Sequence, residues 1–207
     1  MEHCQYLAVF VTAKTLQMGG SRMKKRRWLT ALIVLIPYLS LLTSITIIYS
    51  TRNPVFEFVM ENIFNGQGFF LVGTLFLYCV FATVVSMAYS VKSVIDNWDA
   101  LAFTKTVLTM KLLQIPAYIL NFIWGIILTI TLFTVPFSIG LFFFECFALL
   151  STGLLLSAAV INATRQGAFK VKEVLWVIVM QFVFFVDVIA AVIFYGKLKR
   201  MAEENEN

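Results

Sequence analysis

Residues 137–161 read FSIGLFFFECFALLSTGLLLSAAVI, a continuous apolar stretch in which Glu145 is the single charged side chain. An α-helix rises 1.5 Å per residue, so about 20 apolar residues are needed to cross the ~30 Å hydrocarbon core of a bilayer. This stretch is therefore long enough to form a transmembrane helix.

The whole chain has the composition of a membrane protein. Of its 207 residues, 60% are hydrophobic and 13% are charged, whereas soluble domains carry about 25% charged residues. The net charge of +5 comes from basic residues in short clusters beside apolar runs, without the interleaved aromatic residues that line a nucleic-acid groove. We therefore expect the lipid bilayer as a partner and no nucleic acid.

Five apolar runs qualify as spans, and they lie at about 28–49, 69–90, 112–134, 137–161 and 174–195. The third and fourth runs are separated by so short a connection that they must be antiparallel neighbours. Pro37 inside the first run is tolerated if neighbouring helices bond to the carbonyl that it frees. The sequence predicts an all-α fold: a polytopic transmembrane helical bundle of about five spans, forming a single domain over residues 23–207.

The N-terminal segment has two interpretations. Met23 is followed by the basic cluster at residues 24–27 and then by the first span, which is the usual opening of a bacterial membrane protein. On this interpretation Met23 is the native start, and residues 1–22 are a dispensable extension. On the other, residues 1–22 are a short cytoplasmic segment.

Residues 91–111 also have two interpretations. Their apolar members recur at intervals of three and four residues and include Ile95, Trp98, Leu101 and Leu108. This spacing predicts an amphipathic helix that lies along the membrane interface. The alternative is that the second span continues beyond the bilayer.

Basic residues predict the orientation of the bundle. They gather before the first span, between the second and third, and between the fourth and fifth, and they include Lys92, Lys111 and Arg165. By the positive-inside rule these regions face the cytoplasm. Five crossings then place the N-terminus in the cytoplasm and the C-terminus outside, although the basic residues 197–200 disagree. A re-entrant fifth segment would return them to the cytoplasmic side.

Two acidic residues interrupt the apolar runs, Glu145 in the fourth and Asp187 in the fifth. A carboxylate inside the bilayer costs about 2.5–3.5 kcal/mol on insertion scales, so each needs a partner, a proton or a wet cavity. Each lies about 12 Å below the outer end of its predicted span. If the fifth span crosses outward, the two acids can face each other and share a proton or a cation.

The alternative interpretation of both acids is structural. Each would then be protonated or bonded to a neighbouring polar group, and the spans offer Asn121, Thr152 and Gln181 as partners. None of the five predicted spans contains a lysine or arginine to serve as a buried counter-ion. The sequence therefore favours a candidate proton or cation site at the two acids, with a purely structural role still open.

Other chemistry finds little support. Cys79 and Cys146 are isolated within apolar runs, and the single histidine, His3, lies in the N-terminal extension, so we expect no metal site. No nucleotide-binding, metalloprotease or serine-hydrolase motif is present. We expect no cofactor and no enzymatic activity.

The segment KLLQIPAYIL at residues 111–120, which follows the Trp98 region, resembles a segment of uncharacterised bacterial integral membrane proteins. The likeness covers about a fifth of the chain and contains no catalytic motif. It implies a protein of the bacterial cytoplasmic membrane and carries no functional residue over to this chain.

Two functions remain as hypotheses. The first is a small transporter, or a membrane subunit of a transport complex, with Glu145 and Asp187 beside a proton or cation path. Five spans enclose a site only narrowly, so a homo-oligomer or a partner membrane subunit is expected. The second is a non-catalytic accessory or scaffold protein, which recruits partners at the cytoplasmic face through residues 91–111 and 163–172.

Overall fold

The computed structural model describes residues 28–49, 53–130, 135–169, 171–181, 183 and 186–206. The described residues form helices and contain no strand, which confirms the predicted all-α class. The first described helix spans Trp28–Tyr49 and is called the first helix below. It is followed by α2 (Pro54–Phe64), α3 (Gly68–Ile95), α4 (Ala100–Thr129), α5 (Val135–Arg165), α6 (Val171–Met180) and α7 (Val186–Glu206). The predicted start at Met23 and the extension at residues 1–22 lie outside the described residues.

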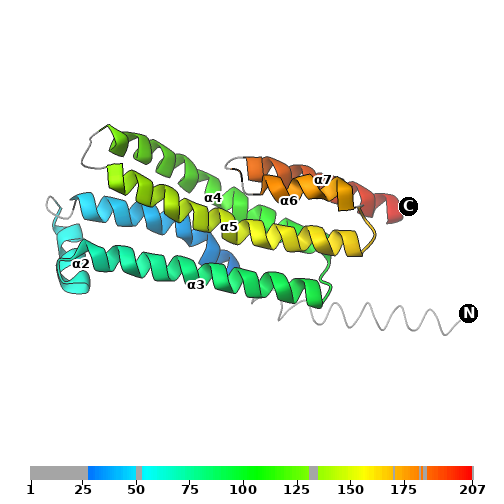
Figure 1. Ribbon diagram of the computed structural model, residues 1–207, viewed down its shortest axis with the longest axis horizontal. Coiled ribbons are helices and arrows are strands. Elements are labelled where there is room, and N and C mark those ends of the chain that lie inside the picture. The colour runs from blue at the N-terminus through cyan, green and yellow to red at the C-terminus, as the bar shows by residue number, and fades with distance from the viewer. Residues whose placement is uncertain are drawn as a thin grey trace, which may run out of the picture.

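Within the described residues, four helices are long and apolar enough to cross a membrane: the first helix, α3, α4 and α5. They fit a multi-pass membrane protein. In α5, 56% of the apolar segment is buried, against 17% to 33% in the other three helices. The difference arises because α3 and α4 both pack against α5, which therefore lies at the centre of the bundle (Figure 1).

Polar side chains of neighbouring helices stabilise the first helix at its proline. Pro37 has no N–H, so the carbonyl of Ile33 lacks its usual helical donor. The side-chain amide of Gln114 in α4 donates to this carbonyl at 2.9 Å. From α3, the hydroxyl of Tyr78 donates to the adjacent carbonyl of Leu32 at 2.6 Å. The expectation that neighbours satisfy the carbonyl freed by Pro37 is confirmed.

Residues 91–111 do not form a separate helix along the membrane surface. The second predicted span continues to Ile95 and α4 begins at Ala100, so the alternative interpretation describes the first part of this segment. Trp98, in the turn between them, is only 8% exposed. The side chain of Gln166 at the end of α5 donates to the carbonyl of Trp98 and accepts from the N–H of Ala100. These contacts pack the turn against α5, so the prediction of an interfacial helix was wrong here.

A short helix, α2, occupies the predicted loop between the first two spans. Its N-terminus is capped by Asn53, whose side chain accepts from the N–H of Val55 at 3.0 Å. Met60 is buried, whereas Val55, Phe58 and Ile63 are exposed. The helix lies across one end of the bundle (Figure 1). Exposed apolar residues in that position are typical of a helix that rests on the membrane interface.

The predicted fifth span, residues 174–195, is not one continuous helix. α6 ends at Met180 and α7 begins at Val186, and the two lie side by side as a hairpin beside α4 and α5 (Figure 1). With 10 residues, α6 is about 15 Å long, which is half of a bilayer core. Among the described residues, the predicted fifth span therefore does not form one complete crossing.

The hairpin also changes the predicted position of the C-terminal end. α7 runs back to the end of the bundle that carries the α3–α4 and α5–α6 turns (Figure 1). The basic residues of α7, Lys197, Lys199 and Arg200, thus lie at the same end as Lys92 and Arg165. The prediction that the C-terminus lies opposite these loops was wrong, because it required a fifth crossing. The side of the membrane that this end faces stays a prediction.

Candidate functional site

A stripe of buried polar side chains runs along α4. It consists of Lys111, Gln114, Tyr118 and Asn121, each less than 10% exposed. Their spacing of three, four and three residues places them on one face of the helix. This face is turned toward the first helix and α5, which supply most of the hydrogen-bond partners described below. We call these four residues the α4 stripe.

At one end of the stripe, Lys111 forms a buried ion pair with Asp187 of α7. The ammonium Nζ lies 2.5 Å from Oδ2, and the two side chains are 0% and 2% exposed. Lys111 also donates to Oγ1 of Thr152 in α5 at 3.2 Å. Removing two charges from water costs several kcal/mol per ion, which only close pairing and further hydrogen bonds offset. The ion pair therefore depends on α4, α5 and α7 being assembled.

The break between α6 and α7 brings Asp187 to this position. Asp187 lies in the first turn of α7, where the partial positive charge of a helix N-terminus favours a carboxylate. Gln181, at the end of α6, is completely buried, and its amide donates to the carbonyl of Val177 at 3.2 Å. Non-helical backbone inside a membrane is tolerated where protein covers it. The buried glutamine and the buried ion pair pack both sides of this break against the protein, whereas Val183 between them is 46% exposed.

At the other end of the stripe, Asn121 bonds to Glu145 of α5. The amide nitrogen Nδ2 donates to Oε1 of the carboxyl group and to the carbonyl of Pro37 at 2.8 Å. Because that carbonyl can only accept, the nitrogen of the amide must face it. Ser40 of the first helix lies 3.5 Å from the same carboxyl oxygen. Side chains from α4 and the first helix thus hold one oxygen of Glu145.

Two acceptor atoms in this cluster have no partner among the described residues. They are Oε2 of Glu145 and Oδ1 of Asn121, and both are buried. Glu145 as a whole is 5% exposed. An unsatisfied buried acceptor is costly, and for a charged group the cost is larger. The two atoms therefore call for a hydrogen-bond donor from outside the described chain.

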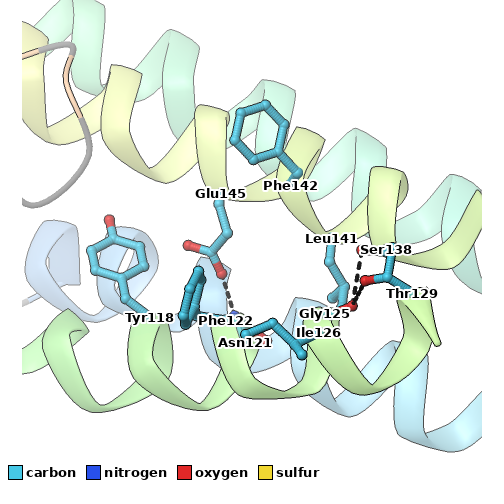
Figure 2. A pocket seen from close by; sticks show the side chains of 10 residues that line it. All are labelled: Tyr118, Asn121, Phe122, Gly125, Ile126, Thr129, Ser138, Leu141, Phe142 and Glu145. Carbon is cyan, nitrogen blue, oxygen red and sulfur yellow. Dashed lines mark hydrogen bonds between the residues drawn. The ribbon is translucent and has the colours of Figure 1, made fainter. Parts of the chain in front are cut away.

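A cavity of ≈ 370 Å³ opens beside these two residues, between α4 and α5. Figure 2 shows Glu145 reaching down from α5 toward Asn121, with Tyr118 on one side and Ser138 on the other. The remaining lining comes from Phe122, Gly125, Ile126, Thr129, Leu141 and Phe142. The volume of the cavity lies within the range of small-molecule sites, about 300–1,000 Å³. Glu145 is the one carboxyl group in the lining, and no lysine or arginine contributes to it.

The two predicted acids do not pair with each other. Glu145 bonds to Asn121 and Ser40, whereas Asp187 bonds to Lys111. Thr152, beside the ion pair, lies seven residues after Glu145 on the same face of α5, which corresponds to about 10 Å along the helix. The prediction that the two acids lie at the same depth in the membrane required the fifth span to cross outward. Because that span is a hairpin, the inference was wrong.

The predicted polar partners have different positions. Asn121 contacts Glu145 directly, and Thr152 reaches Asp187 only through their common neighbour Lys111. Gln181 bonds to the carbonyl of Val177 through both its side chain and its backbone N–H, and neither bond involves an acid. Of the three residues, one thus belongs to each acid cluster and the third lies apart at the end of α6.

Lys111 is the residue that sequence reasoning missed. The sequence predicts a third span that begins at residue 112, which leaves Lys111 in a cytoplasmic loop. In the structure Lys111 is residue 12 of the 30 in α4 and is fully buried. The spacing of the α4 stripe was visible in the sequence. Four polar side chains on one face of a segment, residues 110–128, that is otherwise apolar indicate a buried polar seam, and that seam includes Lys111.

Comparison with known proteins gives a family. The model described as "Family of unknown function (DUF6652)" matches residues 25–200, most of the chain, so the chain belongs to this family. The match includes both acid clusters and the whole α4 stripe. No curated protein and no solved structure matches the chain.

Proposed function

We propose that this member of the DUF6652 family is a small membrane transporter, or the membrane subunit of a transport complex, in which Glu145 takes up and releases a proton or a cation. One observation carries the proposal. The carboxyl group of Glu145 is buried between three apolar helices beside a cavity, with one oxygen held and the other without a partner among the described residues. Intramembrane ionisable groups commonly mark ion and proton pathways.

The α4 stripe supports the proposal by connecting the two charged clusters. Its ends, Lys111 and Asn121, are ten residues apart, or about 15 Å along the helix. Between them, the hydroxyl of Tyr118 donates to Gln114 at 3.1 Å, and Tyr118 also lines the cavity. A proton that enters at the basic end of the bundle would find hydrogen-bonding groups along α4 as far as Glu145.

The scaffold hypothesis has less support. It relied on residues 91–111 as an accessible surface, but Trp98, Ala100 and Phe103 are buried in the core. The end of α5 is also engaged, because Arg165 donates to the carbonyl of Val94 at 2.7 Å. Trp98, Ala100 and Phe103 thus stabilise the turn of the protein itself, whereas Arg165 remains exposed.

The experiment is a flux measurement on purified protein in proteoliposomes that enclose a pH-sensitive dye. A potassium diffusion potential, negative inside, is imposed with valinomycin, and the rate of acidification is recorded. We expect wild-type protein to carry protons faster than empty liposomes and Glu145→Gln to reduce the rate to the empty-liposome level. Glu57→Gln is the matched control, because it removes an exposed carboxylate of α2. Equal rates for wild type and Glu145→Gln would refute the proposal.

A further inference from the structure

The cavity between α4 and α5 is open toward the surroundings of the bundle. Phe122, Ile126 and Phe142 line it and are 60%, 52% and 62% exposed. In a membrane these side chains face hydrocarbon, so a molecule reaches the cavity from the bilayer. The occupant must therefore be soluble in lipid over most of its surface.

The bottom of the cavity selects the polar part of the occupant. The two acceptors without partners among the described residues, Oε2 of Glu145 and Oδ1 of Asn121, belong to residues that both line it. The hydroxyl groups in the lining belong to Tyr118, Thr129 and Ser138, and each donates elsewhere: to Gln114 and, in two cases, to the carbonyl of Gly125. The two polar residues beside the cavity thus carry buried acceptors that lack a donor, one of them on the single carboxyl group, and the complement is a cationic donor.

Other occupants fit this chemistry less well. A plain acyl chain would leave both acceptors without water or a donor, which is costly for buried polar groups. A phosphate or carboxylate headgroup would meet Glu145 with no lysine or arginine in the lining to compensate. A divalent metal ion prefers six or more oxygen ligands, and no cluster of metal-binding side chains occurs in the described part of the chain.

We propose that this cavity binds a hydrophobic primary amine from the bilayer, whose ammonium group donates hydrogen bonds to Glu145 and Asn121. A charge-assisted hydrogen bond is about twice as strong as a neutral one, so the ammonium is favoured over a hydroxyl. The apolar body of the molecule lies against Phe122, Ile126 and Phe142. The inference rests on the proposed function, because it names the class of molecule that would exchange with a proton on Glu145.

Binding to protein in lipid nanodiscs tests the inference with three probes that share the adamantyl cage. 1-Adamantanamine carries both a charge and N–H donors, N,N,N-trimethyl-1-adamantylammonium carries the charge alone, and 1-adamantanol is neutral. Tritiated 1-adamantanamine is measured by equilibrium dialysis against empty nanodiscs, and the other two probes compete with it. We expect saturable binding of the amine, with both competitors at least about tenfold weaker, since a hydrogen bond to a charged group contributes about 1.5–3 kcal/mol.

Variants locate the binding. Glu145→Gln should weaken the amine at least about tenfold, whereas Glu57→Gln should leave it unchanged. Gly125→Leu is a second test that keeps the carboxyl group. A Cβ at Gly125 meets only Ser138 Oγ, at 3.6 Å, so the helix tolerates it while the longer side chain fills the cavity and abolishes binding. Amine binding that survives both Glu145→Gln and Gly125→Leu overturns the proposal, as does equal affinity for the trimethyl probe.

The two proposals fail in different ways. If proton flux depends on Glu145 but no amine binds, the transport function stands and the ligand class is wrong. If the amine binds through Glu145 but flux equals that of empty liposomes, the ligand class stands and proton transport is wrong.

Discussion

Lys111 and Asp187 form an ion pair of 2.5 Å between α4 and α7, and both side chains are withdrawn from the surface. The other ion pair among the described residues, Lys199 with Glu203, lies within α7 and is more than half exposed. The contrast matters because a buried charge without its partner is far more costly than an exposed one. The buried pair joins the hairpin of α6 and α7 to the four-helix bundle.

Asp187→Asn should destabilise the protein by about 3 kcal/mol or more, because it leaves the ammonium of Lys111 buried with no opposite charge. The double variant Lys111→Met with Asp187→Asn should be more stable than the single variant, since no charge is then stranded. The measurement is the thermal unfolding midpoint of the detergent-solubilised protein. Glu203→Gln is the control and should change stability by less than about 1 kcal/mol. A double variant no more stable than Asp187→Asn would show that the charge is not the cause.

The hairpin predicts that the end of α3 and the end of α7 are accessible from the same side of the membrane. In a chain whose native cysteines are replaced, single cysteines are placed at Lys92, Glu203 and Glu61, which are all exposed. An impermeant maleimide applied to sealed vesicles should reach Lys92→Cys and Glu203→Cys from the same side, and Glu61→Cys from the other. Labelling of Glu203→Cys together with Glu61→Cys would restore the fifth crossing.

Much of the fold follows from the sequence, because hydrocarbon imposes simple rules on length and polarity. The spans predicted at 28–49 and 137–161 lie within the first helix and α5, and Pro37 has the neighbouring donor that its helix requires. Their apolar runs exceed the bilayer thickness, so no competing structure buries the backbone polar groups. The class of fold therefore needs no tertiary information.

The hairpin could not be read from hydropathy. Residues 174–195 are apolar throughout except for Gln181 and Asp187, and an apolar run has the same hydropathy whether it crosses or turns back. What distinguishes the two is Lys111, a partner 76 residues earlier in the chain. A tertiary contact of this kind leaves no local signal. The basic residues 197–200 were the one indication, and the structure agrees with them.

Only part of the candidate site can be predicted from the sequence, for a similar reason. Glu145 stands out in the sequence as a charge in an apolar run. Asn121, to which it bonds, is among the polar partners that the sequence predicts. The cavity depends on how α4 and α5 separate beyond these residues, which only the packed structure shows. Sequence thus identifies the costly group, while its access to a ligand depends on tertiary geometry.

Gln114 and Pro37 should be energetically coupled, although they do not bond to each other. Gln114→Leu removes the donor to the carbonyl of Ile33. We expect a loss between about 0.6 kcal/mol, the average for hydrogen bonds between membrane helices, and about 1.7 kcal/mol, the maximum. In Pro37→Ala the backbone gains an N–H that can satisfy the same carbonyl, so Gln114→Leu should then cost less. A double-mutant cycle on unfolding midpoints measures the difference. Additive effects would mean that Gln114 stabilises the helix pair by some other contact.

Exchanging the carboxyl and amide groups of the Glu145 cluster tests its hydrogen bonding. In the wild type the amide of Asn121 donates to the carbonyl of Pro37 at 2.8 Å. Asn121→Asp removes this donor and places a carboxylate against both that carbonyl and the carboxyl group of Glu145. We expect it to be among the least stable single variants, with a loss of at least about 1–3 kcal/mol for each donor removed. Adding Glu145→Gln restores one donor, because the new amide can bond to the new aspartate. The double variant should therefore unfold above Asn121→Asp but below wild type, since the carbonyl of Pro37 remains without its donor. If the double variant unfolds no higher than Asn121→Asp, the bond between the two side chains does not stabilise α4 against α5.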